Sequence, residues 1–325
     1  ERAFRDAAHR VTLTVQQQRL CGVPMEPRGA LARWDPITRE LTVWTSTQAP
    51  FRIRSSLARM LGLDEARVRV IAPDVGGGFG VKGGPYREEV LVAWLARRLE
   101  RPVKWVSTRA EDLLTTNHGR GGKSTGEMGL DADGRILGLR ARIRQPLGST
   151  LAVTVGGTPQ NHGRCLPGSY VVEHVDIESV GVFTTTPPVG AYRGAGRPEA
   201  AFLIERLMDE AARTLKIDPA ELRRRNMIPK ERFPFKTATG QVYDSGDYAE
   251  VLERTLVMAD YAGLRRAQAE RRARGEIVGI GVAKYVEPSA LGWESGQVRV
   301  EATGAVLAVT GSSAHGQGHE TTFAQ

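Results

Sequence analysis

Three glycine-rich segments of the sequence contain residue types that could surround a ligand. Residues 75–84 read V-G-G-G-F-G-V-K-G-G, residues 190–199 read G-A-Y-R-G-A-G-R-P-E with Arg193 at the fourth position, and residues 311–321 carry a G-Q-G around Gln317. Glycine permits positive φ angles and lets backbone approach a ligand closely. Free N–H groups ahead of a helix also bind anions. We expect the three loops to form the walls of one cofactor cleft.

The first loop permits another interpretation. Residues 78–83 fit G-x-G-x-x-G between an expected strand and an expected helix, which is the pattern of a nicotinamide-dinucleotide site. Gly76 and Gly77 are not needed for that turn, and no acidic residue closes the next expected strand at 103–106. A nicotinamide-dependent dehydrogenase using Gly78–Gly83 and a plain structural turn therefore remain alternatives.

Metal binding by protein side chains has little support in the sequence. Only two cysteines occur, Cys21 and Cys165, so we expect no disulfide scaffold, structural zinc site or iron–sulfur cluster in this chain. His315 and His319 have the i, i+4 spacing of zinc ligands on a helix, but Gly316 and Gly318 between them disfavour a helix. We predict no metal held directly by side chains.

Composition excludes several classes of protein. The 325 residues carry a net charge of +8, with 41% hydrophobic and 25% charged residues, which is typical of a folded globular chain. The arginine runs at 223–225 and 265–274 are expected to be solvated helix faces, and the 6% aromatic content disfavours stacking on nucleic acid. No apolar run is long enough for a membrane span.

The pattern of elements predicts an α/β (α+β) fold in two domains. We place a first domain at residues 1–235, a linker at 236–246 containing two glycines, and the start of a truncated second domain at 247–325. The chain begins at Glu1 rather than Met and stops just after a glycine-rich run, so we expect a piece of a longer protein. Strands are predicted at 11–15, 41–44, 67–72, 103–106, 136–143, 174–182, 278–286, 298–301 and 305–310, and helices at 53–61, 86–99, 199–215, 219–226, 248–259 and 263–274.

Taken together, these segments resemble the molybdenum-cofactor-binding large subunit of the xanthine dehydrogenase/aldehyde oxidase family, in the branch of aerobic carbon monoxide dehydrogenase. The resemblance covers nearly the whole chain and implies two molybdopterin-binding domains. The matching stretches are M-E-P-R at 25–28, S-T-Q at 46–48, residues 76–82, residues 191–197, R-R-R-N-M-I at 223–228 and G-Q-G-H-E-T at 316–321.

The resemblance also implies roles for individual residues. Gln48 matches a glutamine that hydrogen-bonds an oxo ligand of molybdenum, and Arg193 matches the arginine of the active-site loop. Phe79 and Gly80, following Gly78, match a pair lining the metal site, where a backbone N–H contacts an oxygen ligand of the cofactor. Gly316, Gln317 and Gly318 match the cofactor-contacting G-Q-G.

The implied activity is hydroxylation of an aldehyde or an N-heterocycle with water as the oxygen source. The general-base glutamate of the family lies beyond Gln325, so this chain alone is expected to be inactive, and Glu26, Glu88 and Glu89 are not candidates for that role. The implied cofactor is molybdenum–molybdopterin, in the cytosine dinucleotide form.

Two departures from the family pattern narrow the range of expected substrates. Gly194 replaces the copper-binding cysteine of carbon monoxide oxidisers, and Gly83 replaces a glutamate of xanthine enzymes. Carbon monoxide and purines are therefore not the expected substrates.

The resemblance also implies partner subunits that carry 2Fe–2S clusters and FAD, in a dimer of heterotrimers. The implied location is cytoplasmic, or periplasmic if the protein is exported with a partner.

Overall fold

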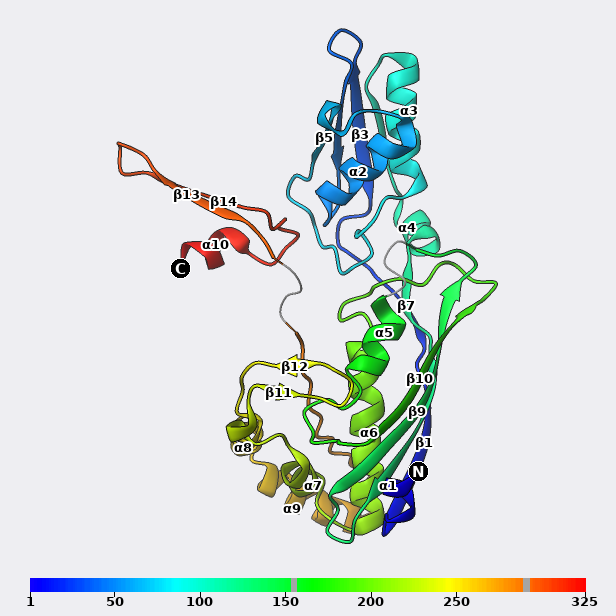
Figure 1. Ribbon diagram of the computed structural model, residues 1–325, viewed down its shortest axis with the longest axis vertical. Helices are drawn as coiled ribbons and strands as arrows, with labels where there is room; N and C mark the ends of the chain where they lie inside the picture. Colours follow the sequence, from blue (N-terminus) through cyan, green and yellow to red (C-terminus); the bar gives the residue numbers. More distant parts are fainter. Residues whose placement is uncertain (153–156, 289–292) are drawn as a thin grey trace.

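The computed structural model describes residues 1–152, 157–288 and 293–325. Figure 1 shows an upper lobe and a lower lobe, with a hairpin projecting to one side. Each lobe has its own hydrophobic core. Residues 1–235, which the sequence predicted as one domain, thus contain two packing units.

The upper lobe is a four-stranded sheet covered by two helices. It consists of strands β3 (Gly29–Asp35), β4 (Glu40–Thr45), β5 (Val68–Ile71) and β6 (Val103–Val106) and helices α2 (Pro50–Leu61) and α3 (Arg87–Leu99). The strand order is β5–β4–β3–β6, with β4 and β5 parallel and the other neighbours antiparallel. Leu41 and Val43 from the sheet meet Ile53, Leu57 and Ala93 from the helices in its core, and all five are inaccessible to solvent.

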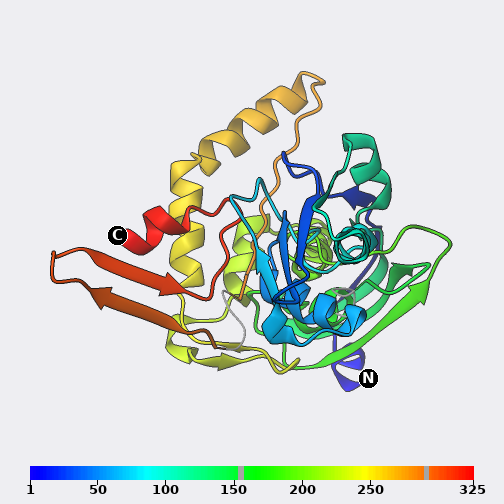
Figure 2. The same cartoon turned by 90° about the horizontal axis from the view of Figure 1, so that it is seen from above.

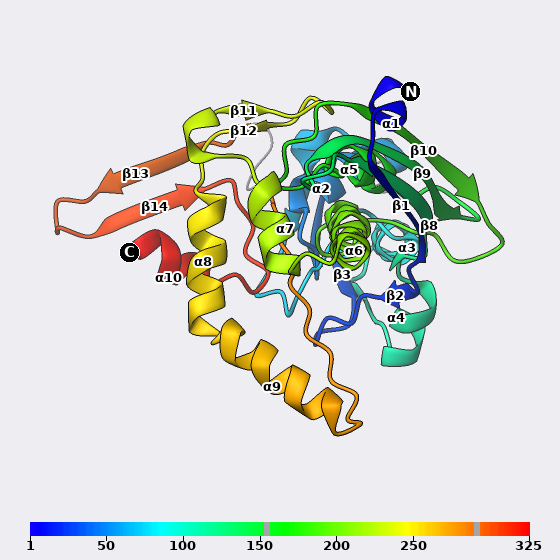
Figure 3. The ribbon, with the colours of Figure 1, turned by 90° about the horizontal axis from the view of Figure 1, so that it is seen from below.

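The lower lobe is a second four-stranded sheet with a long helix along one face (Figure 3). Its elements are strands β1 (His9–Gln16), β8 (Lys123–Leu130), β9 (Ile136–Gly148) and β10 (Val175–Phe183) and helix α6 (Arg197–Leu215). Leu203 and Leu207 of α6 pack with Met128 and Leu139 of the sheet. An ion-pair ladder that includes Arg140 lies on the partly solvated outer face.

The remaining elements join the lobes and extend beyond them. Short strands β2 (Arg19–Cys21) and β7 (His118–Arg120) pair antiparallel with each other. Figure 2 shows the β13–β14 hairpin, whose strand residues are all exposed, projecting away from both lobes. The other elements are α1 (Arg2–Arg5), η1 (Glu65–Arg67), α4 (Arg109–Thr115), α5 (Gly157–Arg164), α7 (Pro219–Asn226), η2 (Lys230–Arg232), β11 (Phe235–Lys236), β12 (Val242–Tyr243), α8 (Tyr248–Met258), α9 (Tyr261–Ala273), β13 (Gly296–Val300), β14 (Val306–Thr310) and α10 (His319–Ala324).

The mixed α/β class is confirmed, but two local predictions are wrong. Residues 278–286 form no strand, because no described strand pairs with them. A side chain hydrogen-bonds the backbone of this segment instead: Gln268 Nε2 donates to Val278 O at 2.9 Å. Arg223 is not solvated; it is fully buried, because its guanidinium pairs with Glu205 at 2.7 Å and Asp209 at 2.9 Å on α6.

The segment predicted as a linker, 236–246, is packed against the lower lobe. Part of it pairs in the β11–β12 hairpin. Thr239 Oγ1 donates to Arg164 O at 2.6 Å, and Tyr243 Oη donates to Gly168 O at 2.9 Å. Within the described ranges, no helix combines the length and apolar character needed to cross a bilayer.

Candidate functional site

The first glycine-rich loop connects β5 to α3 through a tight turn at its centre. Phe79 has φ +50° and Gly80 has φ +86°, and Val81 N donates to Gly78 O at 3.0 Å. A Cβ atom on Gly80 would lie 2.5 Å from Ala191 O in the second glycine-rich segment. Glycine is therefore required at position 80 both by the backbone conformation and by the close approach of the second loop.

A pocket of about 830 Å³ lies where the three glycine-rich loops meet. The loops contribute different groups to it: the first supplies the Phe79 ring, the second supplies Arg193, and the third supplies Gln317. None of the lining residues is acidic. They are Val23, Met25, Val75, Gly76, Gly77, Phe79, Gly80, Arg193, His315, Gly316 and Gln317.

Gln48 lies against the same loop and is held by it. Gly80 N donates to Gln48 Oε1 at 2.8 Å, and a Cβ atom on Gly78 would lie 2.6 Å from that oxygen. The Gly80 N–H is therefore engaged by the protein itself. Among the described residues, no acceptor bonds the N–H groups of Gly78 and Phe79 or the Nε2 of Gln48. These three groups remain as donors beside the pocket.

The loop that carries Arg193 is held at its backbone. Arg193 N donates to Phe79 O at 3.0 Å, and Arg193 O accepts from Arg120 Nη2 at 2.7 Å. The guanidinium of Arg193 lies 6.0 Å from the centroid of the Phe79 ring.

A buried ion pair supports this loop from below. Arg120 Nη1 lies 3.2 Å from Glu199 Oε1, and Glu199 Oε2 accepts from Gly196 N at 2.9 Å. Glu199 is inaccessible to solvent, and this burial raises its pKa above the ordinary value despite the neighbouring Arg120. The pair connects the loop to β7 and to the start of α6.

The third loop folds back on itself through its glutamine. Gln317 Oε1 accepts from His315 N at 2.7 Å, and its Nε2 lies 2.9 Å from His315 Nε2. Gly316 has φ +110°; Gly318 has φ +75° and stands at the start of α10 rather than in the pocket wall. His319 packs on Phe323 at 4.9 Å between ring centroids. In the described part of the chain, no group of three or more His, Cys, Asp or Glu residues is placed to hold a metal ion.

The topology does not support the nicotinamide alternative. In the sheet, β4 and β3 lie between β5 and β6, so the strand that follows the glycine-rich loop and α3 is not a neighbour of the strand before them. Glu89 also occupies the start of α3, since its carboxylate accepts from Tyr86 N at 2.9 Å and from Thr45 Oγ1 at 2.6 Å. A phosphate at that helix start would compete with the protein's own carboxylate.

Sequence reasoning missed a buried ion pair beneath the first loop. Lys82 is 2% exposed, and its Nζ lies 3.1 Å from Glu26 Oε2. Glu26 belongs to the M-E-P-R segment, in which Arg28 pairs with Asp112 at 3.0 Å and Glu88 at 3.2 Å. A lysine inside a glycine-rich loop was a visible signal, but its partner lies 56 residues away in the sequence.

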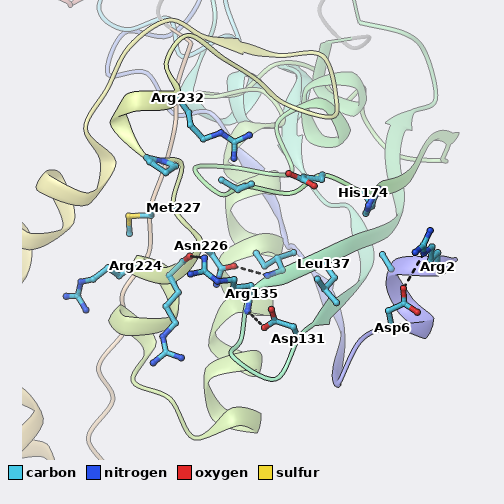
Figure 4. Close-up of a pocket in the computed structure, with 16 residues that line it drawn as sticks. Arg2, Asp6, Asp131, Arg135, Leu137, His174, Arg224, Asn226, Met227 and Arg232 are labelled. Atoms are coloured by element: carbon cyan, nitrogen blue, oxygen red, sulfur yellow. Dashed lines mark hydrogen bonds and ion pairs between the residues drawn. The ribbon is translucent and has the colours of Figure 1, made fainter.

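A second pocket, of about 510 Å³, lies near α1 and α7 at the other end of the lower lobe (Figure 4). Its polar groups join neighbouring segments of the fold: Asp131 Oδ1 accepts from Arg135 N at 2.8 Å, and Asn226 Oδ1 accepts from Ile136 N at 2.8 Å. It contains none of the predicted site residues.

The pocket between the three loops fits an anionic cofactor that carries its own metal. It offers Arg193, glycine backbone and the amide side chain of Gln317, and no carboxylate lines it to repel an anion or to ligate a metal.

Comparison with known proteins agrees with this chemistry. Residues 1–227 and 254–325 each match a family model described as a molybdopterin cofactor-binding domain. Over the whole chain, the sequence is 34% identical to the nicotine 6-hydroxylase large subunit of Paenarthrobacter nicotinovorans. Over 99% of the chain, it is 37% identical to the carbon monoxide dehydrogenase large chain of Hydrogenophaga pseudoflava.

In both cases the chain spans 42% of the relative's length. The crystal structure of quinoline 2-oxidoreductase from Pseudomonas putida 86 superimposes with a TM-score of 0.94 at 36% identity, covering 99% of this chain and 43% of that one. The chain therefore belongs to the molybdopterin cofactor-binding domains of the xanthine dehydrogenase family, as its sequence resemblance indicated.

Proposed function

We propose that the full-length protein is the molybdenum-cofactor subunit of a hydroxylase that oxidises an N-heterocycle. The observation that carries this proposal is the pocket at which Phe79, Gly80, Arg193 and Gln317 meet, lined by residues of two matched domains of this family. When bound, the cofactor supplies a two-electron oxidation in which water provides the oxygen atom. The chain's own residues bind and orient the reacting groups.

The candidate site residues have distinct roles in this proposal. Gln48, with its carbonyl fixed by Gly80 N, presents its Nε2 as a donor to a cofactor oxygen. The N–H of Phe79 supplies a second donor. Gly316 and Gln317 contact the cofactor from the third loop, and Arg193 places a positive charge beside the substrate. Such fixed donors stabilise negative charge that develops during the reaction.

The loop around Gly194 disfavours carbon monoxide as the substrate. Gly194 has φ +96°, and a Cβ atom there would lie 2.5 Å from both Cδ and Cγ of Pro198. The copper-binding cysteine expected in carbon monoxide oxidisers would therefore be strained and would clash with a rigid ring. Gly83 in place of a glutamate likewise disfavours a purine.

An aromatic heterocycle fits the rest of the pocket. Val23, Met25, Val75 and Phe79 present apolar surface, and Arg193 supplies a charge at one side. Two of the similar proteins bear the names nicotine 6-hydroxylase and quinoline 2-oxidoreductase, which favours a flat nitrogen ring over an aldehyde.

Electron transfer requires partner subunits in this proposal. The chain has two cysteines, and biological iron–sulfur clusters are held by about four ligands. Relatives named as a large subunit, a large chain and a complex subunit support partners that carry 2Fe–2S clusters and FAD. The cytosine dinucleotide form of the cofactor and a dimer of heterotrimers complete the proposal.

The test uses the full-length complex from molybdate-replete cells, with an artificial electron acceptor and isotope-labelled water. Quinoline, nicotine, benzaldehyde, xanthine and carbon monoxide are supplied separately. We expect a hydroxylated N-heterocycle carrying the label, and no oxidation of carbon monoxide. Complex from tungstate-grown cells is the control. Oxidation of a substrate that requires a nicotinamide cofactor and incorporates no labelled oxygen would contradict the proposal.

A further inference from the structure

Lys82 is a buried cation at the end of the first glycine-rich loop, and its ammonium group is fully used. Lys82 Nζ donates to Ser46 Oγ at 2.6 Å, to Glu26 O at 2.8 Å and to Glu26 Oε2 at 3.1 Å. An ammonium group has three donors, so every proton is bound within the protein. Lys82 therefore joins the end of the loop to two other segments of the upper lobe.

Glu26 grips the beginning of the same loop. Its carboxylate accepts from Gly76 N at 2.8 Å, and its own N–H donates to Gly76 O at 3.1 Å. Its Oε2 also accepts from Ser46 Oγ at 2.6 Å. A Cβ atom on Gly76 would lie 2.5 Å from Glu26 Cβ, so the contact admits only glycine. Glu26 thus binds both the N–H and the carbonyl of Gly76, the first through its side chain and the second through its backbone.

The same cluster reaches Gln48 through the backbone of Lys82. Lys82 O accepts from Gln48 N at 3.1 Å and from Thr47 Oγ1 at 3.1 Å. Gln48 in turn receives the Gly80 N–H from the middle of the loop. The ion pair therefore closes a ring of contacts around the turn that carries Phe79.

The electrostatics of the pair agree with a fixed, buried contact. Burial lowers the pKa of Lys82 below its ordinary value, against the opposing effect of Glu26. Burial opposes ionisation of Glu26 as well, but hydrogen bonds from Ser46, Gly76 and Lys82 lower its pKa below the ordinary value. Removing Glu26 would leave the buried ammonium of Lys82 without its counter-charge, whereas removing Lys82 would leave a partly exposed carboxylate unpaired.

We propose that Lys82 and Glu26 are positioning residues, which hold the glycine-rich loop and Gln48 in the arrangement that receives the cofactor. Neither residue needs to contact the reacting atoms, because each acts on the position of the loop through its contacts with Gly76 and Gln48, and Gln48 in turn binds Gly80. The identity of the ligand rests on the proposed function, whereas the order of the loop does not.

The test measures amide hydrogen exchange in the full-length complex, over peptides that cover residues 75–86 and over the rest of the upper lobe. Lys82→Met is expected to raise exchange in the loop on the order of tenfold or more, with little change in β3 and β4. If Lys82→Met does not fold, the same measurement is made on Glu26→Ala, because Glu26 is partly exposed. Glu26→Gln keeps an acceptor for Gly76 and is expected to give a smaller increase than Glu26→Ala.

Arg223→Met is the matched control, since it breaks a buried ion pair in the lower lobe and has no contact with the loop. It is expected to lower thermal stability without raising exchange at residues 75–86. Molybdenum content and the separate effects on kcat and KM are measured for each variant. We expect Glu26→Gln to retain more molybdenum than Glu26→Ala.

Unchanged exchange in the loop, or an equal rise throughout the upper lobe, would overturn the proposal. If the unmodified complex contains no molybdenum, the proposed function fails, and the exchange comparison still decides whether the pair orders the loop.

Discussion

The contact between Gly80 and the second loop gives a prediction with an internal control. Gly80 has φ +86°, and a Cβ atom would lie 2.5 Å from the carbonyl oxygen of Ala191. Gly240 has φ +85°, but a Cβ atom there would meet no described atom within 4 Å. Replacing each with alanine therefore separates backbone strain from the clash.

The two variants should differ by the energy of the clash. A left-handed conformation costs an L-residue about 1–2 kcal/mol, which applies to both Gly80→Ala and Gly240→Ala. Overpacking against a fixed backbone adds about 1–3 kcal/mol at Gly80 alone. We expect about 1–2 kcal/mol of destabilisation for Gly240→Ala and about 2–5 kcal/mol for Gly80→Ala.

The assay compares urea denaturation, molybdenum content and turnover of the full-length complexes. Only Gly80→Ala should lose molybdenum and turnover, because relief of the clash must separate the loop of Phe79 from the loop of Arg193, which are joined at Arg193 N and Phe79 O. Equal destabilisation by the two variants, with molybdenum and turnover unchanged in Gly80→Ala, would refute the reasoning.

Three further variants test other parts of the structure. His162 is 1% exposed, and among the described residues neither of its ring nitrogens has a hydrogen-bond partner. Burial lowers its pKa to about 4, so the unfolded chain binds more protons than the folded one as the pH falls from about 6.5 to 4, and folding stability should drop by about 3 kcal/mol. His162→Leu should lack this drop when the free energy of unfolding is measured at pH 7 and at pH 4. Gly194→Cys should lower stability and gain no carbon monoxide oxidation with added copper; measurable oxidation would show that the loop tolerates the cysteine. Arg120→Met should cost about 3–5 kcal/mol, because it leaves Glu199 buried and unpaired; a cost below about 1 kcal/mol, the range of exposed pairs, would show that the pair does not support the Arg193 loop.

The sequence predicted elements well where the signal is local. Helix α7 was predicted at its observed bounds, because Asp218 caps it by accepting from Ala220 N at 2.9 Å and Pro219 starts it without losing a needed donor. Residues 278–286 have a strand-like composition, but a strand forms only beside a partner. Arg223 was misassigned for the same reason, since its burial depends on carboxylates from another helix.

The candidate site shows the same limit. Resemblance selected Phe79, Arg193 and Gln317, which the structure brings to one pocket from segments more than a hundred residues apart. The pairing of Lys82 with Glu26 depends on how the upper lobe folds, which no local pattern in the chain reveals.

The measurement that tests the central claim most directly is elemental analysis of the native full-length complex for molybdenum, together with analysis of the nucleotide released by mild acid. Stoichiometric molybdenum with equivalent cytidine monophosphate is the result expected from a molybdopterin cytosine dinucleotide bound between the three glycine-rich loops. Complex purified from molybdate-replete cells with neither molybdenum nor a released nucleotide would contradict the assignment of that pocket.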